Sequence, residues 1–139
     1  YKSELKKLGL GLETRLKSKV GLLSGGQRQA VTLLMATLVD PRLLLLDEHT
    51  AALDPKTAKR VLDITNEIIQ EKKLTALMVT HNMKDAIHLG NRLIMMHEGR
   101  VIYDVKGEEK KKLTVEVLLK KFEEASNEEF ANDRMILTK

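Results

Sequence analysis

Two adjacent carboxylates follow a short, continuous apolar run, and their chemistry suits a metal ion and a water molecule. Residues 43–46 are all leucine, and Asp47 and Glu48 come directly after them. An apolar run this short favours a fully buried strand over a helix. Carboxylate oxygens are ligands that Mg²⁺ prefers, so Asp47 can bind that ion directly or through water. Glu48 can orient or deprotonate a water molecule, although the pair can also be a solvated strand end.

A second candidate site is the start of the helix predicted from Ser24. Ser24 and Gln27 have the spacing of a capping box, and Gly25 and Gly26 occupy the first turn. Each glycine weakens a helix by about 0.8–1 kcal/mol relative to alanine, so two in succession need a reason. Close approach of a ligand is one, since such glycines expose backbone N–H groups to an anion such as phosphate. The alternative is a plain capping box with glycines in its first turn.

A third candidate follows residues 75–80, which are predicted to form another buried strand. His81 comes directly after them. Ligands of open α/β sheets bind beyond the carboxyl ends of the strands, where His81 and the two carboxylates would both lie. The histidine can donate a hydrogen bond to a phosphate there.

The elements that must position these residues alternate between helices and strands. Residues 1–22 are interpreted as a helical segment rich in leucine and lysine. The next helix runs from Ser24 to about Val39, because the residue before Pro41 avoids the helical region. Asp54 and Pro55 predict the start of the next helix, as N-cap and first helical residue. The remaining predicted elements are a short helix from Asn82 with Gly90 as its C-cap, a hairpin around Glu98 and Gly99, and a last helix capped by Thr114. This order predicts an α/β fold with a largely parallel sheet. The lysines at positions 110–112 are interpreted as a solvated helix flank.

Composition restricts the kind of protein that these elements build. The chain has 139 residues, 42% hydrophobic and 32% charged, which is typical of an ordered globular domain or part of one. The absence of cysteine excludes disulfides and thiolate metal sites. Aromatic residues make up only 3% and the net charge is only +4, so we expect no nucleic-acid partner. No stretch approaches the ~18 apolar residues of a membrane span, so we expect no direct membrane insertion.

Four segments together resemble the motifs of ABC-type ATPases. Residues 23–29 (LSGGQRQ) resemble the signature motif, and residues 43–48 (LLLLDE) resemble the Walker B strand with its catalytic glutamate. Residues 51–54 (AALD) resemble the D-loop, and His81 resembles the switch histidine. They occur in the family's order and at its spacing. The resemblance covers residues 1 to about 107. It implies a P-loop NTPase-like ABC ATPase domain, α/β in class and partial, with largely parallel strands, flanking helices, and a small C-terminal hairpin and helix.

The resemblance also implies how the chain is organised. Residues 1–107 would be the C-terminal half of a nucleotide-binding domain, with a helical signature part at 1–40 and an α/β core part at 41–107. Residues 108–139 would be a C-terminal helical extension and polar tail. No Gly-x-x-x-x-Gly-Lys-Ser/Thr P-loop occurs in the sequence, which opens with Tyr1 rather than Met. We therefore expect a fragment that does not hydrolyse ATP by itself.

Each motif residue acquires a role from the resemblance. Nucleotide would be bound by the signature residues Ser24, Gly25, Gly26 and Gln27. Of these, Ser24 and Gly26 would contact the γ-phosphate of ATP held by a partner subunit. Asp47 would hold Mg²⁺ through water, and Glu48 would be the general base for the attacking water. Asp54 would span the dimer interface and help to place the opposite nucleotide. His81 would contact the γ-phosphate and link it to the catalytic water.

His49 departs from the resembled family, which usually has proline between the catalytic glutamate and the following threonine. A proline would fix φ at about −65° and stiffen this turn. The sequence leaves two interpretations open: His49 is only a turn residue, or its imidazole tunes Glu48. Adjacent residues that leave a strand tend to point apart, which favours the first.

The implied function is that of an ATP-binding and ATP-hydrolysing subunit of an ABC transporter. A run like residues 48–55 (EHTAALDP) resembles a subgroup of bacterial importers of small organic nutrients. The implied partners are a second ATPase subunit in a head-to-tail dimer and transmembrane permease subunits. The subunit would be cytoplasmic, peripheral on the inner face of the cell membrane. Two alternatives remain open: a soluble ABC ATPase outside transport, and a catalytically inactive half-domain that acts only in dimerisation.

Overall fold

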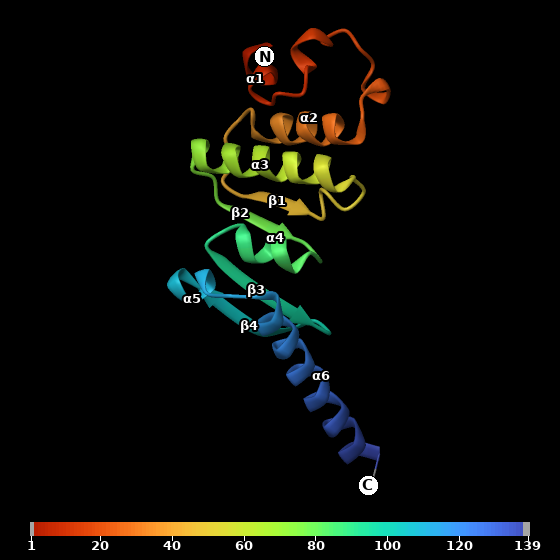
Figure 1. The fold of residues 1–139 in the computed structure, drawn as a ribbon, viewed down its shortest axis with the longest axis vertical. Helices are drawn as coiled ribbons and strands as arrows, with labels where there is room; N and C mark the ends of the chain where they lie inside the picture. Colours follow the sequence, from red (N-terminus) through yellow and green to blue (C-terminus); the bar gives the residue numbers. More distant parts are fainter. Residues whose placement is uncertain (1, 138–139) are drawn as a thin grey trace. The chain divides into compact units, whose positions relative to one another are not determined.

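A computed structural model describes the backbone of residues 2–137 and the side chains of residues 2–126. The chain forms two compact units, the first ending at Val79 and the second beginning at Thr80 (Figure 1). The first contains α1 (Lys2–Lys7), the 3₁₀ turns η1 (Leu12–Thr14) and η2 (Val20–Leu22), α2 (Gly25–Thr37), β1 (Leu44–Asp47), α3 (Pro55–Lys72) and β2 (Ala76–Val79). The second contains α4 (Met83–His88), β3 (Arg92–His97), β4 (Arg100–Lys106), α5 (Gly107–Lys111) and α6 (Val115–Leu137). The α/β class inferred from the sequence is confirmed.

Both long helices of the first unit begin at the predicted caps. The Gln27 backbone N–H donates to Ser24 Oγ at 3.3 Å, and the Ser24 N–H donates to Gln27 Oε1 at 3.0 Å, which completes the capping box. Asp54 Oδ1 accepts a bond of 3.1 Å from the Thr57 N–H, and Pro55 is the first residue of α3. The signals at these two helix starts were therefore sufficient to place them.

The two strands of the first unit pair in parallel, with Leu44 opposite Ala76 and Asp47 opposite Val79. The face of β1 that carries Leu44 and Leu46 packs into the same core as α2 and α3. The buried core of this unit consists of Leu8, Leu12, Leu23, Ala30, Leu33, Leu34, Leu44, Leu46 and Ile64. The parallel arrangement predicted from the sequence is confirmed for this pair.

The prediction that both strands are fully buried is wrong. Leu45 is 65% exposed and Leu77 is 53% exposed, although Leu44 and Leu46 are buried. Successive side chains of a strand point to opposite faces of the sheet, and the core of the first unit covers only one face. A run of four leucines therefore does not by itself say that both faces are covered.

The second unit is built on an antiparallel hairpin at the predicted position. Glu98 and Gly99, which join β3 to β4, have φ values of 46° and 75°. Positive φ at both turn residues matches the twist of the flanking strands, and Gly suits the second position. Leu93, Val105 and Leu118 form the buried core of this unit.

Local signals also placed α4. Asn82 Oδ1 accepts bonds of 3.0 and 3.3 Å from the backbone N–H groups of Lys84 and Asp85, so Asn82 is the predicted N-cap. The C-cap is Leu89, and Gly90 comes one residue later with φ 69°, not as the C-cap itself. This left-handed position after the cap is where glycine is favoured in helix termination.

The prediction of a solvated lysine flank is wrong for Lys110. Lys111 and Lys112 are exposed, but Lys110 is only 4% exposed and its Nζ donates to Ile87 O. That carbonyl belongs to the last turn of α4, where helical acceptors lack partners within the helix. Burial lowers the pKa of the Lys110 ammonium. The side chain therefore fixes α4 to α5.

Candidate functional site

The first two backbone N–H groups of α2 lie outside the hydrogen bonds of the helix. Arg28 is the first residue whose N–H donates to a carbonyl of this helix, Ser24 O, at 2.9 Å. The Gln27 N–H is already bonded to the Ser24 hydroxyl. The amides of Gly25 and Gly26 therefore lie outside the bonds of the helix itself, at its positive end. This is the geometry in which helix N-termini bind phosphate.

The Gln27 side chain is engaged within the unit rather than turned out to solvent. Its Oε1 accepts from the Ser24 N–H and, at 3.4 Å, from Arg15 Nη1, while its Nε2 donates to Leu10 O at 3.0 Å. Gln27 thus ties the segment of residues 10–15 to the start of α2. No local pattern indicated Arg15 at this position, because the two residues are twelve positions apart in the chain, on either side of η2.

The two glycines of the first turn are packed against α3 and the residues before it. A Cβ at Gly26 would lie 2.2 Å from Thr57 Cγ2, and a Cβ at Gly25 would lie 2.9 Å from Leu53 Cδ2. Close approach of a ligand is one reason for two successive glycines at this point. The structure supplies another, which is close approach of the start of α2 to Leu53 and the first turn of α3.

The two carboxylates stand at the carboxyl end of β1. Asp47 is the last residue of the strand and is exposed. Glu48 has φ 41°, its N–H donates to Val79 O at 3.0 Å, and its carbonyl accepts from the Ala51 N–H at 3.0 Å. A left-handed conformation at a residue other than glycine costs free energy and persists only where the surroundings enforce it. Such strain is common at functional sites, and nothing in the local sequence announces it.

His49 turns toward α3. Its Nε2 lies 3.1 Å from Thr65 Oγ1, and burial lowers the pKa of the imidazole. Thr65 is fully buried on the apolar face of α3. The contact favours the interpretation of His49 as a residue of the turn over that of an imidazole that tunes Glu48.

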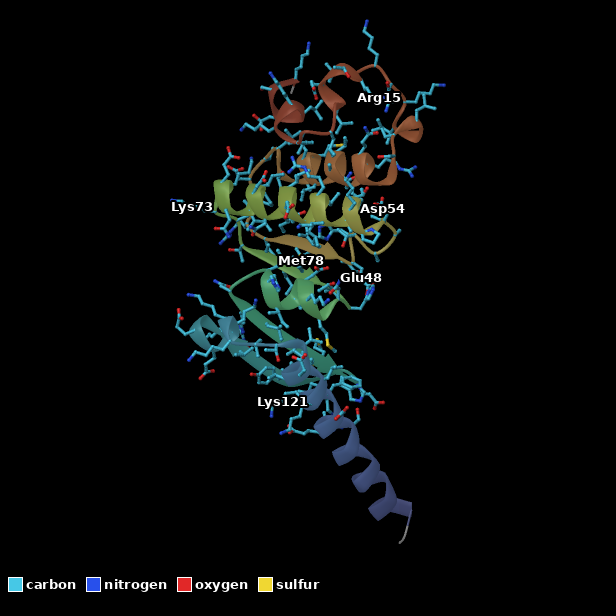
Figure 2. All side chains as sticks on the ribbon, viewed as in Figure 1. Arg15, Glu48, Asp54, Lys73, Met78 and Lys121 are labelled. Atoms are coloured by element: carbon cyan, nitrogen blue, oxygen red, sulfur yellow. The ribbon has the colours of Figure 1, made fainter. Side chains whose placement is uncertain are left out.

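Asp54, predicted to lie at a dimer interface, also has a local role. Its carboxylate caps α3, and hydrogen bonds from Thr57 lower its pKa. Figure 2 shows Asp54 and Glu48 at the same end of the first unit. The starts of α2 and α3 are joined there through the contact of Gly26 with Thr57. The structure therefore gathers the signature residues, both carboxylates and Asp54 at one end of this unit.

His81 belongs to the second unit. It is exposed and directly precedes Asn82, the N-cap of α4. The Asn82 N–H donates to Thr80 Oγ1 at 3.1 Å, which shapes the turn around the histidine. His81 is thus placed with respect to α4, at the start of its own unit.

Asp47 is a suitable but insufficient ligand for Mg²⁺. Its exposed carboxylate offers the hard oxygen that the ion prefers. Among the side chains described, no group of three or more acidic, histidine or cysteine residues could hold a metal. Mg²⁺ usually keeps several waters and takes further oxygens from substrate phosphates, so one carboxylate fits that mode of binding.

The sequence of this chain is similar to one known protein family and to several known proteins. Residues 2–51 match the family described as ABC transporter. The chain is 55% identical over 121 residues to a tyrosine transport ATP-binding protein of Clostridioides difficile (strain R20291), covering 87% of this chain and 48% of that protein. It is 33% identical over 132 residues to the methionine import ATP-binding protein MetN 2 of Oenococcus oeni (strain ATCC BAA-331 / PSU-1), covering 91% of this chain and 36% of that protein.

Solved structures show the same likeness. The chain resembles an inward-facing conformation of a metal-chelate type ABC transporter with a TM-score of 0.70 and 29% identity, over 87% of this chain and 47% of that chain. It resembles a nucleotide-free ATP-binding cassette of an ABC transporter with a TM-score of 0.62 and 25% identity, over 79% and 44%. The chain thus spans about half the length of these proteins, or less. None of the helices that the structure describes has the length and apolar character needed to cross a bilayer.

Proposed function

Since this chain is part of an ABC transporter ATP-binding domain, we propose that it supplies the signature, Walker B, D-loop and switch segments of a subunit that hydrolyses ATP to drive transport. The observation that carries the proposal is the position of Glu48. It leaves the carboxyl end of β1 on an enforced left-handed backbone, at the same end of the unit as the amides that begin α2. Positioning and charge stabilisation provide most of the catalysis in phosphoryl transfer, so the fixed backbone is well suited to it.

Each residue has a defined task in the proposed reaction. Glu48 accepts the proton of the water that attacks the γ-phosphate. Asp47 holds Mg²⁺ through water, and the bound ion neutralises charge on the phosphates. His81 donates a hydrogen bond to the γ-phosphate and links it to the attacking water.

The signature segment is proposed to act on nucleotide held by a second subunit. In the proposed complex the amides of Gly25 and Gly26, at the positive end of α2, bind the phosphate, and Ser24 contributes its side chain there. Gln27 supports them from behind through its bonds to Leu10 and Arg15. Asp54 is proposed to take part in the same head-to-tail interface, and its position at the start of α3, whose Thr57 lies against Gly26, supports this.

The relatives suggest the class of cargo. One is named for tyrosine transport and another for methionine import, so we assign this subunit to a bacterial importer of amino acids or similar small organic nutrients. Its partners would be a second ATPase subunit and transmembrane permease subunits. The permease would hold it at the inner face of the cell membrane, on the cytoplasmic side.

Substitution of Glu48 tests the proposal in a subunit that joins this chain to a P-loop. Glu48→Gln keeps the shape of the side chain but removes the proton acceptor, so ATP binding should remain while steady-state phosphate release falls by at least about 100-fold. Trapped ATP should then hold two copies together, giving a dimer in size-exclusion chromatography with ATP and Mg²⁺. Glu67→Gln, on an exposed side chain of α3, is the matched control and should turn over ATP normally. Full turnover by Glu48→Gln would contradict the assignment.

A further inference from the structure

Glu48, in the turn after β1, has a strained backbone that several hydrogen bonds restrain. Glu48 has the left-handed φ of 41°, and its backbone donates to Val79 O and accepts from the Ala51 N–H, both at 3.0 Å. The next residue, His49, is bound to Thr65 of α3. Because a strained backbone needs surroundings that over-determine it, each of these bonds is a restraint on the conformation of Glu48.

The direction of the His49–Thr65 bond follows from the hydrogens available. Thr65 Oγ1 lies 2.8 Å from Val61 O, and a carbonyl can only accept, so the single hydroxyl hydrogen is used there. His49 Nε2 lies 3.1 Å from the same Oγ1. The imidazole therefore carries a hydrogen on Nε2 and donates it to Thr65.

Thr65 is a fixed anchor for this bond. Its side chain is fully buried, and α3 packs through Ile64 and its neighbours into the core of the first unit. A β-branched side chain inside a helix has few rotamers, and the bond to Val61 O selects among them. The acceptor oxygen is therefore held by the helix rather than by the turn.

We propose that the His49–Thr65 hydrogen bond is a positioning device, which anchors the residue after Glu48 to α3 and thereby keeps the carboxylate of Glu48 in its working place. The inference rests on the proposed function of Glu48 as general base. His49 and Thr65 touch no reacting group in it and act only through the backbone of the turn. A proline at position 49 would restrain the turn through its ring, whereas histidine does so through a bond to a buried hydroxyl.

Two substitutions at Thr65 distinguish loss of the hydrogen bond to His49 from a change in core packing. Thr65→Val keeps the volume but removes the acceptor, and Thr65→Ser keeps the acceptor but removes a methyl group. Thr37 provides matched controls, because it is also fully buried and donates to a carbonyl four residues earlier, Leu33 O, at 2.8 Å, without serving a histidine. Thr37→Val and Thr37→Ser therefore report the general cost of the same changes.

The first measurement is made on this chain. Long-range ¹H–¹⁵N correlation of the imidazole should show His49 as the Nε2–H tautomer in the wild type and in Thr65→Ser. Thr65→Val should shift the His49 ring signals, and the Thr37 variants should leave them in place. An Nδ1–H tautomer in the wild type would overturn the inference.

The second measurement is steady-state ATP hydrolysis in the P-loop-containing subunit. Thr65→Val should lower kcat roughly 10- to 100-fold with little change in KM, as expected for a displaced catalytic group, and Thr65→Ser should restore it. Equal kcat for the two Thr65 variants, with Glu48→Gln inactive, would overturn the positioning role alone. Full activity of Glu48→Gln would instead overturn the proposed function, and the tautomer measurement would still judge the hydrogen bond.

Discussion

Replacement of Gly26 by alanine tests the contact between the starts of α2 and α3. The added Cβ would lie 2.2 Å from Thr57 Cγ2, more than an ångström inside the ordinary contact range of 3.4–4 Å. The obstructing atom is the methyl group of a β-branched side chain, which cannot swing away as the end of a long side chain can. Thr57 is further held by the bond from its N–H to Asp54. Either the two helix starts separate or Thr57 leaves its rotamer.

The expected cost is the difference between two effects. Overpacking of a well-packed contact costs about 1–3 kcal/mol, and the stiffness of Thr57 places this case in the upper half of that range. Alanine is favoured over glycine within a helix by up to about 1 kcal/mol. The free energy of unfolding of the first unit should therefore fall by about 1–2 kcal/mol, or roughly 4–8 °C in Tm for each kcal/mol.

Urea unfolding followed by far-ultraviolet circular dichroism measures this loss. Gly21→Ala is the control, because a Cβ there meets no atom within 4 Å, and it should change stability by less than about 0.5 kcal/mol. Thr57→Ser removes the obstructing methyl group and keeps the hydroxyl, so Gly26→Ala should cost little in that background. If Gly26→Ala costs the same in the Thr57→Ser background as in the wild type, or no more than Gly21→Ala, the steric reasoning is refuted.

Three further predictions concern the whole chain, the end of α2 and the start of α3. The chain by itself should show no Mg²⁺-dependent phosphate release in a steady-state assay, because its sequence carries no P-loop; turnover abolished by Glu48→Gln would contradict this. Lys72→Met should lower the free energy of unfolding by about 1 kcal/mol, because Lys72 Nζ donates to Thr37 O and Asp40 Oδ1, both at 2.7 Å, and partial exposure of the site weakens these bonds. Urea unfolding measures this loss, with Lys59→Met as an exposed control. Because the pKa of Asp54 is lowered in the folded state, its charged cap stabilises the fold fully above the ordinary carboxyl pKa of 3.8, and this stabilisation is lost as pH falls through the lower folded pKa. Asparagine is an equally good cap without a charge, so Asp54→Asn should flatten the pH dependence of stability measured between about pH 2 and 6.

Features set by neighbouring residues were predictable from the sequence. The capping box of Ser24 and Gln27, the cap and proline that begin α3, and the turn of Glu98 and Gly99 each depend on contacts within four residues. Short-range hydrogen bonds and φ preferences determine such features, so the side-chain types alone carry the signal.

Features that depend on distant segments could not be predicted in this way. The exposure of Leu45 depends on what covers the second face of the sheet, and the burial of Lys110 depends on the free carbonyl of Ile87. The left-handed backbone of Glu48 depends on restraints from β2, to which it is joined through Val79. For the candidate site residues, the side-chain types alone identify the chemical groups, whereas the contacts that restrain those groups depend on the folded structure.

The packing of α3 also limits which sequences can form this unit. Position 57 contacts position 26, and position 65, eight residues further along the same helix, contacts position 49. A relative with a larger residue than glycine at position 26 should carry a smaller one than threonine at position 57. A relative with proline at position 49 has no side-chain donor for position 65, which is then released to become valine or alanine. The two pairs should therefore covary during evolution, although 31 and 16 residues separate their members along the chain.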